Sequence, residues 1–203
     1  MKAETTEVGL SRPDHVFVLS GPSGVGKNAI AARLCRSGRA VRAVTATSRP
    51  PRPGEGDGVD YYFVSDDEFE SWIKQGRLLE HTRYCGHFYG TPAFSVDRAL
   101  ETGKPVLLVI DVDGALQLKN RWPGIRLIFI APPSAEALME RLQRRADESE
   151  ENVRRRLERA RQEMSLSSRY DWVIVNARLD EAVEQVAQII SGAPAAPGSE
   201  KGR

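Results

Sequence analysis

The chain has little of several features that would point to particular protein classes. It has only two cysteines among 203 residues, Cys35 and Cys85, whose spacing fits neither a metal site nor a disulfide framework. No apolar run approaches the roughly 20 residues of a membrane span, and the polar N-terminus lacks a signal-peptide core. The formal net charge is only +1, so a polyanionic substrate must be met by clustered positive charge. These absences predict a soluble cytoplasmic protein with no membrane or nucleic-acid partner.

The clearest local signal is a glycine-rich stretch, residues 21–28, with the sequence Gly-Pro-Ser-Gly-Val-Gly-Lys-Asn. It follows an apolar run at 16–20 that predicts a buried strand, and it leads into a helical pattern. In that context backbone N–H groups and a helix N-terminus can surround phosphate oxygens, and Lys27 can bridge the terminal phosphates. Asn28 stands where a hydroxyl usually ligates magnesium, and its amide oxygen is a candidate ligand instead. The stretch predicts a nucleotide-phosphate site.

The other apolar runs indicate one α/β unit. Near-continuous runs rich in β-branched residues at 105–111, 125–130 and 172–176 predict further strands of a parallel sheet covered on both faces. Two segments interrupt them. Residues 42–94 are rich in Gly, Pro and aromatic residues and predict a small β-rich insertion with a helix capped by Ser65. Residues 135–167 are helical by composition and rich in arginine.

These patterns divide the chain into a flexible N-terminus, a single domain and a disordered tail. The expected boundaries are 1–13 for the N-terminus, 14–190 for the domain and 191–203 for the tail. Within the domain, the core comprises 14–41, 95–134 and 168–190, the insertion 42–94, and the arginine-rich helical segment 135–167. A chain of this length can bury one sizeable core.

An ordered series of motifs resembles guanylate kinase over nearly the whole chain, from about residue 16 to residue 190. The motifs lie at 20–27, 47–55, 58–64, 79–80, 88–91, 110–115, 128–134 and 173–176. The resemblance implies the P-loop three-layer fold of nucleoside monophosphate kinases. That fold has a five-stranded parallel core sheet, a small mixed β-rich GMP-binding insertion and a helical lid that closes over ATP. It also implies transfer of the γ-phosphoryl group of ATP to GMP or dGMP, with Mg²⁺.

Carried over position by position, the resemblance also implies a set of site residues. The ATP site comprises Gly21, Pro22, Ser23, Gly24, Val25, Gly26, Lys27, Asn28 and Asn176. The GMP site comprises Thr45, Arg49, Arg52, Tyr61, Glu80, Tyr89, Thr91 and Asp111. The catalytic charges are Lys27, Arg52 and the lid arginines Arg145 and Arg156, with a weaker claim for Arg141, and Asn28 is the candidate metal ligand. The oligomeric state is left open between a monomer and a homo-oligomer.

The chemistry of two residue types supports this set independently. A planar arginine fork such as that of Arg49 suits a phosphate dianion. A buried carboxylate such as Glu80 suits guanine, which offers two parallel donors on one edge, whereas adenine offers no such pair. AMP would therefore leave the carboxylate desolvated and unpaired, a penalty of roughly 2 to 4 kcal/mol.

Several positions depart from the family pattern. Asn28 and Ala29 replace two hydroxyl residues, Val109 stands where a carboxylate is usual, and Asp113 where a glutamine is usual. The first departure leaves two alternatives open. One is a catalytically impaired binding module of the same fold, and the other is a kinase of another phosphorylated acceptor, such as a ribose phosphate. Lys27 and the lid arginines argue against the module, and Glu80 argues against a sugar phosphate.

Overall fold

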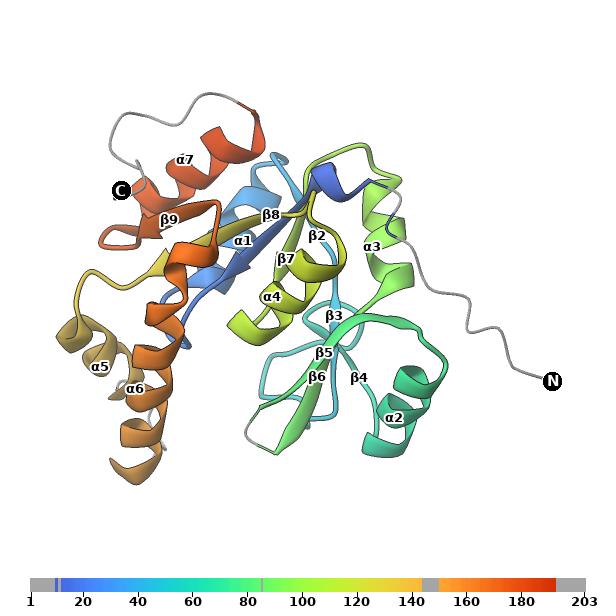
Figure 1. Cartoon of the computed structure of the whole chain (residues 1–203), viewed down its shortest axis with the longest axis horizontal. Coiled ribbons are helices and arrows are strands. Elements are labelled where there is room, and N and C mark those ends of the chain that lie inside the picture. Colours follow the sequence, from blue (N-terminus) through green and yellow to red (C-terminus); the bar gives the residue numbers. More distant parts are fainter. Residues whose placement is uncertain (1–9, 11, 85, 144–149, 193–203) are drawn as a thin grey trace.

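The computed structural model describes residues 10, 12–84, 86–143 and 150–192 of the chain (Figure 1). The strands are β1 (Val16–Ser20), β2 (Val41–Arg42), β3 (Thr45–Thr47), β4 (Tyr61–Phe63), β5 (Leu78–Tyr84), β6 (His87–Pro92), β7 (Val106–Val109), β8 (Arg126–Ala131) and β9 (Trp172–Val175). The helices are α1 (Lys27–Arg36), α2 (Asp66–Lys74), α3 (Ala93–Leu100), α4 (Val112–Arg121), α5 (Ala135–Gln143), α6 (Glu150–Ser165) and α7 (Leu179–Ile190). Short 3₁₀ turns cover Pro13–His15 and Ser167–Arg169.

The larger sheet has five parallel strands in the order β2-β7-β1-β8-β9, which confirms the predicted fold class. The predicted strand at 16–20 matches β1, and the other three predicted strands differ from the observed ones by one or two residues at their ends. The run at 105–111 ends early as a strand because Asp111 turns away to cap α4, accepting a hydrogen bond from Gly114 N at 2.8 Å. Arg42 pairs with Leu107, so this sheet includes residue 42, the first residue of the expected insertion.

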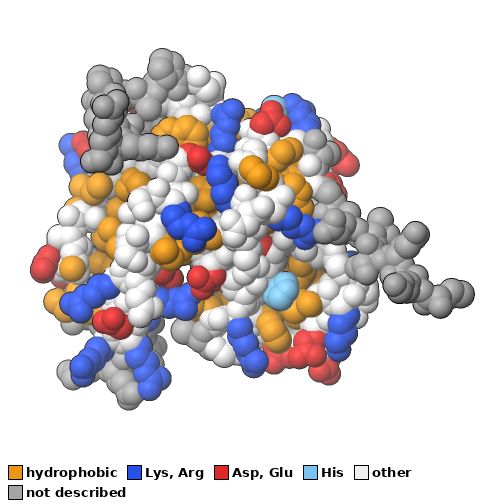
Figure 2. All heavy atoms as spheres, in the orientation of Figure 1, with side chains coloured by type: hydrophobic (Ala, Val, Ile, Leu, Met, Phe, Trp, Pro, Cys, Tyr) orange, Lys and Arg blue, Asp and Glu red, His pale blue; other side chains and the backbone are white. Residues whose placement is uncertain are grey.

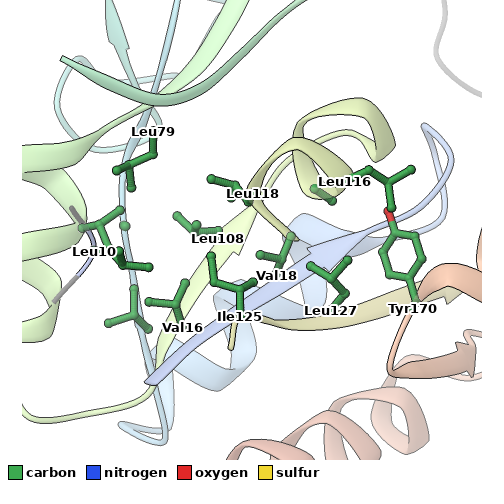
Figure 3. Packing of buried hydrophobic residues seen from close by; sticks show 14 of the residues in the cluster. Leu10, Val16, Val18, Leu79, Leu108, Leu116, Leu118, Ile125, Leu127 and Tyr170 are labelled. Atoms are coloured by element: carbon green, nitrogen blue, oxygen red, sulfur yellow. The ribbon is translucent and has the colours of Figure 1, made fainter. Parts of the chain in front are cut away.

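The central strands β7, β1 and β8 are buried on both faces of the sheet, because their alternate residues point to opposite sides, whereas two valines of the edge strand β9 are exposed. Val16 and Val18 face α3 and α4, forming the cluster drawn in Figure 3. Phe17 and Leu19 face the opposite side, where they pack in a second cluster with residues of α1 and α7. The sheet and the helices on its two sides thus form three layers, with one apolar cluster on each side of the sheet.

The smaller sheet has the strand order β4-β3-β6-β5 and is mixed, with β3 parallel to β4 and antiparallel to β6. Helix α2 covers it through Phe69 and Trp72, which are buried with Leu78. The predicted cap is present, since the hydroxyl of Ser65 accepts a hydrogen bond from Glu68 N at 3.1 Å. In Figure 1 this unit lies beside α4. The face of the molecule seen in this view carries both acidic and basic side chains (Figure 2).

The segments with predicted functional residues follow the carboxyl ends of the parallel strands. The glycine loop follows β1, Asp111 follows β7 and Asn176 follows β9. In an open parallel sheet these ends share one edge, where ligands bind. In the described part of the chain, no helix combines the length and apolar character needed to cross a membrane.

Candidate active site

The glycine loop between β1 and α1 adopts a conformation that only glycine accommodates well. Gly24 and Gly26 have φ angles of 88° and 97°, in the left-handed region. Gly26 also caps α1, and a Cβ there would lie 2.5 Å from Nδ2 of Asn176. The loop backbone is therefore free to face a ligand at the N-terminus of α1, where the helix dipole favours an anion.

Lys27 begins α1 and reaches back over this loop. Its Nζ donates hydrogen bonds to the carbonyl oxygens of Gly21 at 2.5 Å and Pro22 at 2.9 Å. The ammonium group is thereby held at the mouth of the loop before any nucleotide arrives. A phosphate oxygen offers a stronger, charge-assisted acceptor than a neutral carbonyl.

Asn28 and Ala29 lie on the first turn of α1 with exposed side chains. Among the residues that the structure describes, no group of three or more His, Cys, Asp or Glu side chains could enclose a metal ion. Magnesium, however, is usually held by one or two protein oxygens together with substrate phosphates and water. The exposed amide of Asn28 next to Lys27 fits that limited requirement.

Residues from the C-terminal half brace the same loop. Asn176 is buried, and its side-chain amide donates to the carbonyl of Val25 at 2.7 Å. Its backbone oxygen accepts from Arg141 Nη2 at 2.9 Å. Arg156 of α6, a predicted lid arginine, donates to Oγ of Ser23 in the loop at 2.7 Å. Arg145, the other predicted lid arginine, lies outside the described residues.

A second group of predicted residues surrounds Glu80 on β5. Its carboxylate is only 4% exposed and accepts a hydrogen bond from Thr91 Oγ1 at 2.5 Å. Burial raises the pKa of Glu80 to about 8, the hydrogen bond from Thr91 acts in the opposite direction, and the nearby charge of Asp111 raises it further. A Cβ at residue 114 would lie 2.5 Å from the carboxylate, so Gly114 leaves the space that Glu80 occupies.

Glu80 faces a small hollow between the two sheets. Its lining residues are Thr45, Glu80, Thr82, Tyr89, Gly90, Val109, Ile110 and Asp111. Thr45 Oγ1 is buried and has no hydrogen-bond partner among the described residues. Thr82 Oγ1 donates to Asp111 Oδ2 at 2.6 Å, which links β5 to the N-terminus of α4. The hollow measures about 30 Å³, room for one or two water molecules and too little for a purine ring.

A third group lies on β4, β6 and the loop after β3. Arg49 forms two parallel hydrogen bonds with Glu55, Nη1–Oε2 at 2.9 Å and Nη2–Oε1 at 3.0 Å. Its guanidinium carbon lies 5.4 Å from the ring centre of Tyr61, which in turn contacts the ring of Tyr89. Arg52 is exposed, and its backbone N–H donates to Glu55 at 2.7 Å. The hydrogen bond from Arg49 lowers the pKa of Glu55, so this carboxylate is ionised at neutral pH.

The structure thus gathers the predicted residues into three groups: the loop with Asn176 and Arg156, the hollow, and the arginine cluster. Sequence reasoning missed two contributors, Thr82 and Glu55. Glu55 lies inside a recognised motif six residues after Arg49, so its charge was an available signal. Thr82 had no local signal, because its partner Asp111 is 29 residues away.

Comparisons with known proteins agree with this geometry. The family model described as guanylate kinase matches residues 14–193. A guanylate kinase of Gloeobacter violaceus is 50% identical over 176 residues, covering 86% of each chain. One of Thermobifida fusca is 44% identical over 184 residues, covering 90% of this chain and 94% of its own. The crystal structure of guanylate kinase from Anaplasma phagocytophilum superposes with a TM-score of 0.73 at 34% identity, covering 87% of this chain and 84% of that one.

The matches extend through all three groups of site residues. The matched range includes the glycine loop, the strands around the hollow and the described lid arginines. The fold, the site geometry and the similarity of whole chains lead to the same assignment, and the chain belongs to the guanylate kinase family.

Proposed function

We propose that this guanylate kinase transfers the γ-phosphoryl group of ATP to GMP with the residues gathered at the carboxyl edge of its parallel sheet. The observation that carries the acceptor assignment is the buried Glu80 carboxylate, which faces the hollow beside the unpartnered hydroxyl of Thr45. Two parallel donors on guanine would meet the carboxylate, and the base carbonyl would accept from the hydroxyl. Adenine would leave the carboxylate unsatisfied, because its N1 is an acceptor where guanine has a donor.

The donor nucleotide is assigned to the glycine loop. Backbone N–H groups of the loop and the N-terminus of α1 would bind the phosphates, and Lys27 would move from the two carbonyls to a phosphate oxygen. Arg156, already hydrogen-bonded to Ser23 of the loop, would add positive charge as the phosphoryl group moves. We extend the same role to Arg145. Magnesium bound with ATP would supply further charge at the phosphates, with Asn28 as the candidate protein ligand.

The acceptor phosphate is assigned to Arg49, Arg52, Tyr61 and Tyr89. Glu55 occupies both Nη atoms of Arg49, so the GMP phosphate would displace Glu55 or bind the remaining N–H donors, and the contact with Tyr61 fixes the plane of the guanidinium. The exposed side chain of Arg52 would swing in to share the same phosphate. Positioning of this kind accounts for most of the rate in phosphoryl transfer, since the protein supplies little covalent chemistry.

We further propose the division of the chain into a core, a GMP-binding insertion at 42–94 and a lid at 135–167. The mixed sheet and α2 would form the insertion, and α5 and α6 the lid. Closure of both over the core would exclude water and suppress ATP hydrolysis. A cytoplasmic location is part of the same proposal and rests on the two nucleotide substrates. The binding-module and sugar-phosphate alternatives have no support among the relatives compared above.

A coupled ADP-release assay with ATP and Mg²⁺ tests the proposal. GMP, dGMP, AMP, inosine monophosphate and ribose 5-phosphate serve as acceptors. Turnover should be fastest with GMP and dGMP, much slower with inosine monophosphate because it lacks the amino donor, and absent with AMP and ribose 5-phosphate. Lys27→Met should abolish turnover, whereas Arg36→Met, on the exposed end of the same helix, should leave it unchanged. AMP turnover equal to that of GMP, or an active Lys27→Met variant, would contradict the assignment.

A further inference from the structure

Arg159 of α6 joins three parts of the molecule that are distant in the sequence. Its Nη2 donates to Oδ2 of Asp113 on α4 at 2.6 Å, and its Nε donates to Oε1 of Glu163 at 3.0 Å. Its guanidinium carbon lies 5.2 Å from the ring centre of Tyr84 on β5. One side chain therefore connects a lid helix to the core and to the GMP-binding insertion.

Glu163 is the buried member of this group. Its side chain is 9% exposed, against 36% for Arg159 and 54% for Asp113. Burial raises the pKa of Glu163, and Arg159 and Lys27 act against that shift by favouring the ionised form. The charge of Asp111 also reaches this carboxylate. Glu163 therefore lies within electrostatic range of both the phosphate loop and the base-binding side.

This arrangement differs from an ordinary surface ion pair. Arg161, two residues further along α6, pairs with Glu158 at 3.6 Å, and both side chains are mostly exposed. Exposed pairs of this kind contribute little to stability, and this one lies within α6 and connects it to no other helix or strand. Arg159 instead holds two carboxylates through separate nitrogens of a planar fork, a geometry that lysine cannot reproduce.

We propose that Arg159 is a positioning residue for phosphoryl transfer, acting as a latch that holds α6 against α4 and β5 and neutralises Glu163 beside the phosphate site. Without it, lid closure would bring an uncompensated carboxylate toward the ATP phosphates and compete with them for Lys27. The lid would also lose its tie to Asp113 and admit water more readily. The inference rests on the proposed function, because the lid and the reacting phosphates are assigned there.

Steady-state kinetics at pH 8 on the full chain test the latch. Arg159→Met removes the charge and keeps the length of the side chain, and Arg161→Met is the matched control on the same helix. Arg159→Met should lower kcat for GDP formation about tenfold, with KM for both nucleotides changed less than about threefold. Hydrolysis of ATP without acceptor should rise relative to transfer. Adding Glu163→Gln to Arg159→Met should restore most of kcat, because the uncompensated charge is gone.

Asp113→Asn provides a second variant that leaves the buried pair intact. It should increase amide hydrogen exchange along α6 in the unliganded protein, a readout that needs no turnover. An Arg159→Met enzyme with wild-type kcat, a loss shared equally by Arg161→Met, or no recovery with Glu163→Gln would overturn the latch. Unchanged exchange in Asp113→Asn would do the same. A wild-type protein that forms no GDP would instead contradict the proposed function, so the two failures are distinguishable.

Discussion

The raised pKa of Glu80 makes GMP binding depend on pH in a calculable way. The carboxylate has a pKa of about 8 because it is buried, and only its ionised form accepts both guanine donors. About one tenth of the unliganded protein is ionised at pH 7.0, and about three quarters at pH 8.5. The dissociation constant for GMP should therefore fall about eightfold over that interval. Binding at pH 7.0 should release close to one proton.

Isothermal titration calorimetry in two buffers of different ionisation enthalpy measures both quantities. GMP changes little in charge over most of this range, because its second phosphate pKa is about 6. Glu80→Gln is the matched control, since it keeps the shape of the side chain and cannot titrate. It should bind GMP weakly, with a nearly flat pH profile and no proton release. A wild-type dissociation constant that changes less than twofold, without proton release, would refute the reasoning.

The same shift sets the sign of a stability change. Because the folded pKa of Glu80 lies above the unfolded value of 4.5, its neutral form is favoured in the native state. This preference stabilises the folded state. The stabilisation is fully present below about pH 4.5 and is lost as the pH rises through 8. The unfolding free energy of the wild type, relative to Glu80→Gln, should fall by about 1.4 kcal/mol per pH unit between pH 5 and 8. Urea titrations of both proteins at pH 5.5 and 7.5 measure this difference.

Two further predictions concern single hydrogen bonds. Thr82→Val removes the hydrogen bond to Asp111 that connects β5 to α4, so the association rate of GMP in stopped-flow measurements should rise about three- to fivefold. Thr82→Ser keeps the donor and should stay near the wild-type rate. An unchanged rate in Thr82→Val would show that this hydrogen bond does not limit GMP entry. Asp171 accepts from Lys119 at 2.9 Å and from the backbone of buried Leu127 at 2.8 Å. Asp171→Ala should therefore lower the urea unfolding free energy by about 1 to 2 kcal/mol, and an unshifted midpoint would show that water replaces the carboxylate.

Much of the core could be predicted because its signals are local. The strand at 16–20 is a run of apolar residues between polar flanks, and the glycine loop combines composition with position. The two-residue strand β2 gave no such signal, because a run of two residues has no periodicity to detect. Its place in the sheet depends on the pairing of Arg42 with Leu107, which lies 65 residues later in the sequence.

The site was predictable to the extent that it follows recognised motifs. Glu80 and Asp111 were both predicted to belong to the GMP site, and both line the hollow. The partners that tune them could not be predicted, because hydrogen bonds such as that from Thr82 join residues far apart in the sequence. The ion pair between Arg159 and Asp113 spans 46 residues and has no periodic pattern either. Arginine-rich composition indicated the helix, but only the packing shows which guanidinium faces the core.

The small size of the hollow around Glu80 links the admission of GMP to the charge that binds it. In so small a hollow the carboxylate is largely shielded from water, and burial favours its neutral form. Widening the hollow enough for a purine would also hydrate the carboxylate and favour loss of its proton. One movement would thus open the path for the base and generate the anion that attracts it. The unliganded enzyme would thus keep Glu80 protonated, and Glu80 would ionise only when a ligand can enter.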